Sequence, residues 1–223
     1  MSMNHRQFKD RLYAEFARVG HALASEKRLE LLDLLAQAPR RVESLAEETQ
    51  MSVANVSQHL QVLRRARLVE AERSGTKILY RLADESVLRL WLALRSAAER
   101  RLAEVGQITR DYGLAAGDES EISRDELAAL IERGEALLLD ARPRLEYEHG
   151  HIPGALSLPV DELAGRLDEL PRDRRIVAYC RGVYCFFAEE AVALLRAHGF
   201  DAHRLEGGWP EWRSEARPTG DGG

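Results

Sequence analysis

The sequence has few cysteines and no long apolar run, and both absences limit what the protein can be. Two of its 223 residues are cysteines, Cys180 and Cys185, which is too few and too local for the disulfide framework of a small secreted protein. No segment approaches the roughly 18 uncharged apolar residues that a membrane helix needs, and residues 1–16 contain no apolar run typical of a secretory signal. We therefore predict a cytoplasmic protein without membrane contact, whose cysteines serve chemistry.

The negative charge of the chain is unevenly distributed. The formal net charge is −5, yet residues 1–112 hold 19 Lys and Arg against 15 Asp and Glu, whereas the remaining residues hold 13 against 22. Within residues 61–81 six basic side chains accompany two acidic ones, an excess suited to phosphate contacts. A solvated charged surface is the alternative interpretation. With 45% apolar and 31% charged residues, the chain is expected to form two small globular domains.

The first quarter of the chain shows the periodicity of successive helices. Ser25 and Ser52 stand where N-cap residues are expected, each directly before an apolar pattern with helical spacing. The predicted helices are residues 26–37, 41–49 and 53–65, with a turn at residues 51–52. Val56, Leu60 and Leu63 form the inner face of the third of these helices. The order predicts a helix-turn-helix.

Two strand-like runs and a long helical pattern come next. Residues 68–73 and 77–82 are joined by a short turn in which Gly75 can supply the positive φ of a tight hairpin, so these runs are predicted to form a wing. Residues 84–112 repeat an apolar stripe at near-heptad spacing, which favours one long helix and a dimer seam. Packing of the stripe against the same domain is the alternative. Residues 113–121 are small and polar, as expected for a linker.

The outward face of the predicted third helix carries amide and short polar side chains. Gln and Asn side chains can pair with adenine, and Arg and Lys suit phosphates or the minor groove. A solvated helix surface is the alternative for each residue alone. The candidate DNA-binding residues are Asn55, Ser57, Gln58, His59, Gln61 and Arg65 on the helix, with Arg73 and Lys77 on the wing.

The second half of the chain alternates apolar strands with helices. A capping-box pattern at residues 123–126 opens a helix that Gly134 ends. Such an alternation predicts an α/β domain with a parallel sheet buried on both faces. The predicted strands are residues 136–140, 176–180 and 202–206, and the later helices are residues 161–170 and 186–199. The predicted domains are residues 1–112 and 122–215, followed by a flexible tail over residues 216–223.

Residues 17–82 resemble the ArsR family of winged-helix repressors. The resemblance rests on the motifs SQHL (57–60), LRRA (63–66) and LV (68–69). It implies a homodimer on a palindromic double-stranded DNA operator, with Ser57, Gln58 and His59 near the DNA. Many members bind a metal through a cysteine pair on the helix before the turn, where this chain has the sequence RVE. The histidines of this half have no ligand-pair spacing, so we predict no metal and no cofactor.

The second half contains a loop with a candidate reactive cysteine, Cys180. Cys180 ends an apolar strand and precedes a helix, so its thiol is expected at the carboxyl end of the sheet. We expect the helix dipole, inward-facing amides and Arg181 to lower the pKa of Cys180 from about 8.5. A buried, inert cysteine is the alternative. The predicted active-site loop is Arg181, Gly182, Val183 and Tyr184.

Residues 122–215 resemble the rhodanese superfamily. The resemblance rests on the motifs LDAR (139–142), EYEHGHIPGA (146–155), YC (179–180) and LEGGW (205–209), with a further tryptophan at position 212. It implies that Cys180 accepts a sulfane sulfur as a persulfide and passes it to a thiol or cyanide. The remaining motif residues are expected to support the loops by hydrogen bonds and ion pairs. These loop-supporting residues are Asp140, Arg142, Glu146 and His151.

Two positions depart from that pattern. Cys185 stands where many rhodaneses carry a basic or hydroxyl residue, which argues against thiosulfate as the donor. Cys185 is instead a candidate resolving thiol that can attack a persulfide or sulfenic acid on Cys180, if the two Cβ atoms approach to about 4 Å. Related phosphatases and arsenate reductases end a longer loop in an anion-binding arginine, where this chain has Phe186. Phosphate and arsenate chemistry are therefore not expected.

Three hypotheses about function stay open on the sequence alone. The first is a DNA-binding regulator whose affinity depends on the sulfur or redox state of Cys180, with a sulfane-sulfur donor and a thiol acceptor as small-molecule partners. The second is a sulfurtransferase that is tethered to a DNA-binding domain without such dependence. The third is an inactive rhodanese fold used for partner binding, which the presence of Cys180 weakens.

Overall fold

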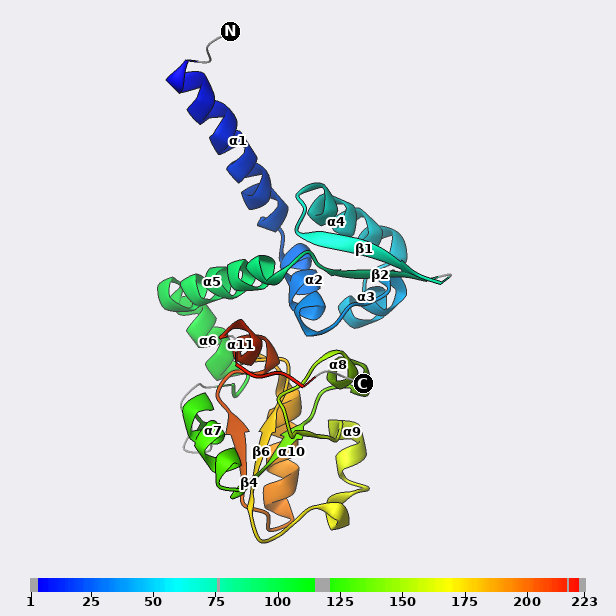
Figure 1. Cartoon of the computed structure of the whole chain (residues 1–223), viewed down its shortest axis with the longest axis vertical. Coiled ribbons are helices and arrows are strands. Elements are labelled where there is room, and N and C mark those ends of the chain that lie inside the picture. Colours follow the sequence, from blue (N-terminus) through cyan, green and yellow to red (C-terminus); the bar gives the residue numbers. More distant parts are fainter. Residues whose placement is uncertain (1–3, 76, 115–120, 216, 221–223) are drawn as a thin grey trace. The chain divides into compact units, whose positions relative to one another are not determined.

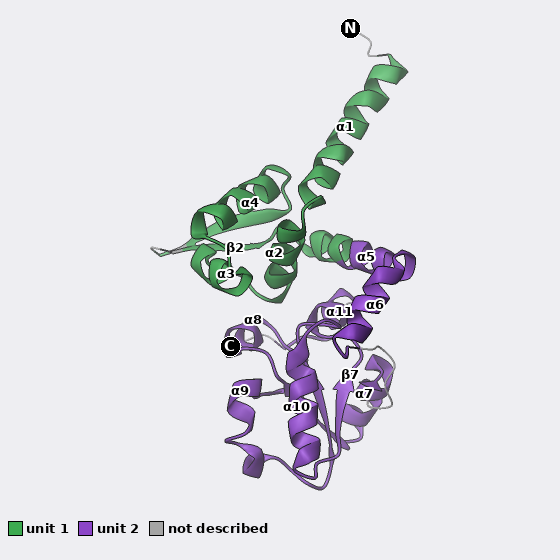
Figure 2. Ribbon diagram, turned by 180° about the vertical axis from the view of Figure 1, so that it is seen from behind, with its two compact units in different colours: residues 1–91 green, residues 92–223 purple. Residues whose placement is uncertain are grey.

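The computed structural model describes residues 4–75, 77–114, 121–215 and 217–220 (Figure 1). The chain divides into two compact units, residues 1–91 and 92–223 (Figure 2). The division falls inside helix α5 (Glu85–Arg101), earlier than the predicted domain boundary after residue 112. Most of the predicted linker, residues 115–120, lies outside the described residues.

The first unit consists of helices around a small core, with one antiparallel hairpin. Its elements are α1 (His5–Leu23), α2 (Glu26–Gln37), α3 (Val42–Thr49), α4 (Val53–Arg65), β1 (Val69–Ser74), β2 (Lys77–Leu82) and the start of α5. Leu31, Leu45 and Leu60 have no exposed surface, so α2, α3 and α4 all contribute to the core. The predicted helix-turn-helix and wing are confirmed.

Local sequence signals explain the helix-turn-helix and the wing. The Ser52 hydroxyl accepts a hydrogen bond from the backbone N–H of Asn55 at 3.2 Å, which satisfies one of the unpaired backbone donors at the start of α4. Gly75 has φ +63°, as the tight turn between β1 and β2 requires. Ser25 precedes α2 as predicted, but its side chain makes no capping hydrogen bond.

The prediction of a single long helix over residues 84–112 is wrong. The structure has two helices, α5 and α6 (Ala103–Asp111), because Leu102 adopts extended backbone angles of φ −108° and ψ 105°. The apolar spacing continues through the break, so the pattern gave no sign of it. Leu102 is 52% exposed, whereas Leu114, just after α6, is buried in the second unit.

The second unit contains a five-stranded sheet in the order β3-β7-β6-β4-β5, and every strand pair is parallel. The strands are β3 (Glu121–Ile122), β4 (Ala136–Asp140), β5 (Leu156–Ser157), β6 (Arg175–Tyr179) and β7 (Ala202–Leu205). The predicted α/β class and parallel sheet are confirmed. Strands β4 and β6 lie at the centre of the sheet, so their carboxyl ends bring Asp140 and Cys180 to the same edge.

Helices cover both faces of this sheet. Helices α9 (Val160–Leu163) and α10 (Phe186–Ala197) pack on one face with Leu139 and Ile176. Helices α7 (Arg124–Glu132) and α11 (Trp209–Ser214) pack on the other face with Leu138 and Val177. The remaining helix, α8 (Arg144–His149), follows β4. The helix predicted over residues 161–170 is replaced by α9 and a 3-10 turn at Leu167–Glu169.

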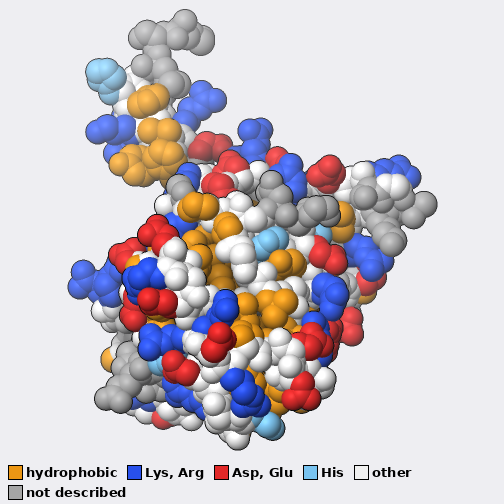
Figure 3. All heavy atoms as spheres, turned by 60° about the horizontal axis from the view of Figure 1, so that its bottom comes forward, with side chains coloured by type: hydrophobic (Ala, Val, Ile, Leu, Met, Phe, Trp, Pro, Cys, Tyr) orange, Lys and Arg blue, Asp and Glu red, His pale blue; other side chains and the backbone are white. Residues whose placement is uncertain are grey.

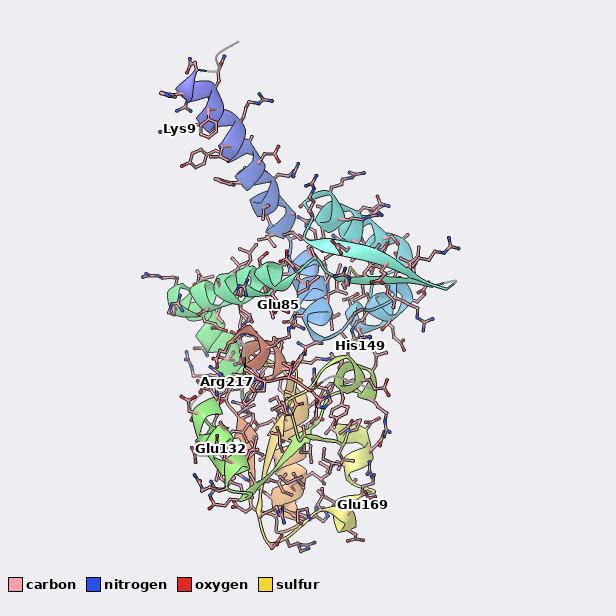
Figure 4. The ribbon with its side chains drawn as sticks, in the orientation of Figure 1. Lys9, Glu85, Glu132, His149, Glu169 and Arg217 are labelled. Atoms are coloured by element: carbon pink, nitrogen blue, oxygen red, sulfur yellow. The ribbon has the colours of Figure 1, made fainter. Side chains whose placement is uncertain are left out.

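Part of the predicted tail packs on the second unit. The Trp212 indole donates to the carbonyl of Pro218 at 2.7 Å, and the backbones of His151 and Gly220 pair. Arg217, labelled in Figure 4, forms an ion pair of 2.6 Å with Asp125. Among the described residues, no helix combines the length and the hydropathy that a membrane crossing requires.

Candidate functional site

The outer face of α4 is polar and accessible. Val56, Leu60 and Leu63 are fully buried, which leaves the amides of Asn55, Gln58 and Gln61 exposed. Ser57 and His59 are partly buried at the flanks of this face, and Arg65 is exposed at the end of the helix. The structure therefore places all six predicted residues of the helix on or beside one surface.

The charges around α4 favour an anionic partner. The helix contains no acidic residue and ends in Arg64 and Arg65. On the wing, Arg73 is exposed and donates to the carbonyl of Gly75 at 3.2 Å, whereas the side chain of Lys77 lies outside the described residues. The side-chain amides and guanidinium groups of such a helix can donate hydrogen bonds to phosphates and to base edges.

The loop after β6 holds both cysteines. Cys180 directly follows the strand and is 1% exposed, while Cys185 is partly exposed and is the N-cap residue of α10. The Cys180 thiol lies 3.7 Å from the carbonyl oxygen of Gly182 and 3.5 Å from that of Cys185. The loop thus folds back over the first cysteine and brings the second one to it.

The LEGGW motif closes this loop from the other side. The Trp209 amide donates to the carbonyl of Cys180 at 3.1 Å. A Cβ atom at Gly208 would lie 2.5 Å from the Gly182 nitrogen, a separation that side chains do not tolerate. The second glycine of the motif is therefore required by the close approach of two backbones.

The pKa values of the two thiols are shifted in opposite directions, and that of Cys180 is not lowered as the sequence predicted. Burial raises the pKa of Cys180 well above its ordinary value, and its hydrogen bond with Cys185 raises it further. That hydrogen bond lowers the pKa of Cys185 to about 7, and the backbone amides of Phe187 and Arg181 act in the same direction. The prediction that Cys180 has a lowered pKa is wrong for the reduced pair. In this pair Cys185 is the thiol that ionises more readily.

The Arg181 side chain pairs with a carboxylate of α8. Its guanidinium forms an ion pair of 2.6 Å with Glu146, whose side chain has no exposed surface. The guanidinium also lies 5.3 Å from the ring centroid of Phe187. Arg181 therefore anchors the loop to α8, and its charge contributes to the lowered pKa of Cys185 instead of that of Cys180.

Asp140 and Arg142 form a fully buried ion pair under the loop. The Arg142 guanidinium donates to both carboxylate oxygens of Asp140, with a shortest distance of 2.6 Å, and also to the carbonyl of Gly150 at 2.8 Å. The Tyr179 hydroxyl donates to Asp140 at 2.5 Å and accepts from the Ile152 amide at 3.1 Å. Tyr179 was not among the predicted loop-supporting residues, although its place beside Cys180 in the YC motif was a signal.

His151 lies apart from this pair. Its ring stacks on Tyr147 at a centroid distance of 3.8 Å, and Nδ1 lies 3.0 Å from the carbonyl oxygen of Tyr147. The four predicted loop-supporting residues thus occupy three places: Asp140 with Arg142, Glu146 with Arg181, and His151 with Tyr147. Within the described part of the chain, no group of three His, Cys, Asp or Glu side chains has the arrangement of a metal site.

A pocket of about 230 Å³ opens over the loop and includes a residue that the sequence did not indicate. Its lining consists of Arg95, residues 181–185, Phe186 and Phe187. Arg95 comes from the part of α5 that belongs to the second unit, and it forms ion pairs with Glu99 and Glu211. Arg95 and Glu99 have the i,i+4 spacing of a helical ion pair, whereas only the fold brings Glu211 to them.

Two family models match the chain, one in each half. Residues 25–71 match the bacterial regulatory protein, arsR family, and residues 123–215 match the rhodanese-like domain. The HTH-type transcriptional regulator Rv0324 of Mycobacterium tuberculosis is 46% identical over 96% of this chain and 94% of its own length. These matches and the fold define a winged helix-turn-helix regulator with a rhodanese-like domain. The chain belongs to the ArsR family of HTH-type transcriptional regulators and carries a C-terminal rhodanese-like domain.

Two further likenesses each cover only part of the chain. A tRNA uridine(34) hydroxylase of Erwinia tasmaniensis is 30% identical over 61% of this chain, which spans only 40% of that protein. A solution structure of the homodimeric winged helix-turn-helix DNA-binding domain (fragment 1–100) of a possible ArsR-family transcriptional regulator from Mycobacterium bovis is 43% identical. It covers 46% of this chain and 93% of its own, with a TM-score of 0.43.

Proposed function

We propose that this regulator binds double-stranded DNA through α4 and the wing, and that its affinity for DNA depends on the sulfur or oxidation state of Cys180 and Cys185. The observation that carries the proposal is the pair of cysteines in one loop, with the Cys180 sulfur 3.5 Å from the carbonyl oxygen of Cys185, in a chain that also has an exposed polar face on α4. Residues Asn55, Ser57, Gln58, His59, Gln61, Arg65, Arg73 and Lys77 are the proposed DNA contacts.

The thiol pair can accept a sulfur atom from a hydropersulfide. The Cys185 thiolate takes the proton of Cys180 while the Cys180 sulfur attacks the outer sulfur of the donor RSSH. The S–S bond of the donor breaks, RS⁻ leaves, and Cys180 becomes a persulfide with Cys185 now a thiol. Attack of Cys185 on the inner sulfur of that persulfide then forms a Cys180–Cys185 disulfide and releases H₂S.

A sulfurtransferase tethered to a DNA-binding domain is the second candidate. The division of the chain into two compact units favours it, because each unit has its own buried core. In that case Cys180 turns over with a donor and a thiol acceptor, while DNA affinity does not change.

The two candidates are separated by one measurement of DNA affinity. Fragments from the promoter of the protein's own gene are titrated at fixed salt with the reduced protein and with protein exposed to polysulfide, and Cys180→Ser is the control. We expect a change of affinity in the wild type alone. Equal affinities before and after exposure, together with turnover of the donor, would establish the tethered enzyme.

A homodimer is proposed on the apolar surface of the first unit and α5. Phe8, Tyr13 and Phe16 of α1 and Leu90 and Leu94 of α5 are exposed. Figure 3 shows hydrophobic side chains grouped along α1. A pair of exposed apolar stripes supports association with a second copy, with light scattering of the full chain as the test. A cytoplasmic location is proposed with it.

A further inference from the structure

Two residues of the 181–185 loop, Gly182 and Tyr184, contact side chains of α5. The Tyr184 hydroxyl donates to Glu99 Oε1 at 2.8 Å, and the Arg95 guanidinium lies 5.8 Å from the Tyr184 ring centroid. Burial, together with the neighbouring Glu99 carboxylate, raises the pKa of Tyr184, so its hydroxyl keeps the proton that this hydrogen bond needs. All of these residues belong to the second unit.

A second contact reaches the glycine of the same loop. Arg95 forms an ion pair with Glu211 of α11, and the two side chains are 12% and 13% exposed. A Cβ atom placed on Gly182 would lie 3.4 Å from Glu211 Oε1 and 3.6 Å from Arg95 Nη1, and Gly182 has φ +138°. Arg95 and Glu211 therefore pack directly on the backbone between the two cysteines.

Neither family explains why α5 carries these residues. Arg95 and Glu99 lie outside both matched segments, which end at residue 71 and begin at residue 123. The opening turns of α5 belong to the first unit, where Val87 and Leu88 are buried and the Trp91 indole donates to Asp33 at 2.9 Å. Glu85, labelled in Figure 4, is the first residue of this helix. The first turns of α5 thus belong to the first unit, and its later residues Arg95 and Glu99 contact the 181–185 loop within the second unit.

We propose that Arg95 and Glu99 are positioning residues that hold the 181–184 loop in its dithiol conformation and transmit a change in that loop to α5. A Cys180–Cys185 bond, or an extra sulfur on Cys180, alters the space between the cysteines where Gly182 and Tyr184 lie. The contacts of Tyr184 with Glu99 and of Gly182 with Arg95 and Glu211 then change, and α5 responds. This inference rests on the proposed function, because it explains how the state of the thiols reaches the DNA-binding unit.

Thermodynamic linkage makes the inference measurable in both directions. If loading of the thiols changes DNA affinity by some factor, bound DNA must change the equilibrium of loading by the same factor. A residue that merely stabilises the fold would not alter this factor. The experiment therefore measures the ratio of DNA affinities between the polysulfide-treated and the reduced full chain, and the extent of loading with and without the promoter fragment.

The variants are Arg95→Ala, Tyr184→Phe and the conservative Arg95→Lys, with Arg100→Ala as the matched control. Arg100 is exposed on the same helix and its side chain contacts Ser96 of α5. In the wild type and in Arg100→Ala, we expect the DNA affinities of the polysulfide-treated and reduced chains to differ by at least about fivefold. In Arg95→Ala and Tyr184→Phe, we expect the two affinities to agree within about twofold. Arg95→Lys is expected to restore part of the ratio, because it keeps the charge opposite Glu211.

The outcomes separate the inference from the function on which it rests. A wild-type ratio of unity overturns the proposed function. A wild-type ratio that survives unchanged in both Arg95→Ala and Tyr184→Phe overturns the role of α5 and leaves the sulfur-dependent regulation standing. Tyr184→Phe removes only one hydroxyl, so its result decides the question even if Arg95→Ala fails to fold.

Discussion

In the first unit the side chains proposed for function are exposed, whereas in the second unit they are buried. Gln58 and Gln61 project from α4 and have no described side-chain partner to hold them, while Asp140, Arg142 and Glu146 have no exposed surface at all. A surface that binds DNA must offer its donors to the ligand. A reactive loop must instead be held in one geometry, and buried ion pairs do this because each charge left without its partner is costly.

The difference extends to the sources of stability. The first unit is held by leucines of α2, α3 and α4 and by helix caps, and its buried Arg40 pairs at 3.3 Å with Glu48, whose side chain is 30% exposed. The second unit adds a polar layer under the loop, in which Arg142 also lies 5.3 Å from the Trp209 ring centroid. Changes in this buried polar layer should therefore affect folding of the second unit, whereas changes on the exposed face of α4 should affect DNA binding.

The largest expected effect comes from breaking the buried pair. Arg142→Ala leaves the Asp140 carboxylate buried without its cation, and we expect the free energy of unfolding to fall by about 3–5 kcal/mol. Urea unfolding of the second unit measures the loss. Arg166→Ala, which removes an exposed ion pair with Glu169, is the matched control with no measurable change expected. A loss in Arg142→Ala no greater than in the control would contradict the comparison of the two units.

The next effect concerns the exposed face of α4. Gln58→Ala removes an amide that can pair with a base edge, and we expect DNA affinity to fall by about 1–3 kcal/mol with no change in stability. Titration of the promoter fragment at fixed salt measures it. Gln107→Ala, in the exposed face of α6, is the control. Equal affinities of Gln58→Ala and the wild type would remove Gln58 from the DNA surface.

The smallest effect is a pH dependence that separates the two thiols. The pKa of Cys185 is lowered to about 7, so its thiolate, the reactive form, is present above that pH and declines below it. We expect the rate of alkylation by iodoacetamide to fall about tenfold per pH unit below the pKa. In Cys180→Ala the hydrogen bond from the Cys180 thiol is lost, and the midpoint is expected to move up toward about 8.5. An unchanged midpoint in that variant would show that Cys180 does not set the acidity of Cys185.

Local patterns in the sequence predicted most of the elements. The bounds of α2 and α4, the strand β4 and the hairpin with Gly75 follow from capping residues, apolar spacing and turn chemistry, all of which act over a few residues. The same local signals missed the break at Leu102 and the split of residues 161–170. In both places the apolar spacing stays in phase through the break, so periodicity does not reveal it.

The candidate site was predictable in its membership and less so in its partners. The motifs placed Asp140, Cys180 and Cys185 at one edge of the sheet, because adjacent parallel strands end on the same side. They did not show that Arg181 pairs with Glu146, or that its charge lowers the pKa of Cys185. An arginine beside a cysteine in sequence can reach many carboxylates, and only the fold selects one.

The sequence by itself determined the two kinds of domain, the loop with both cysteines and the polar face of α4, because periodicity and motifs are properties of neighbouring residues. The tertiary structure alone decided which thiol is the more acidic, and it alone brought Arg95 and Glu99 of α5 to Gly182 and Tyr184. Burial and contacts between residues about 85 positions apart depend on the packing of whole elements, and no local pattern records them.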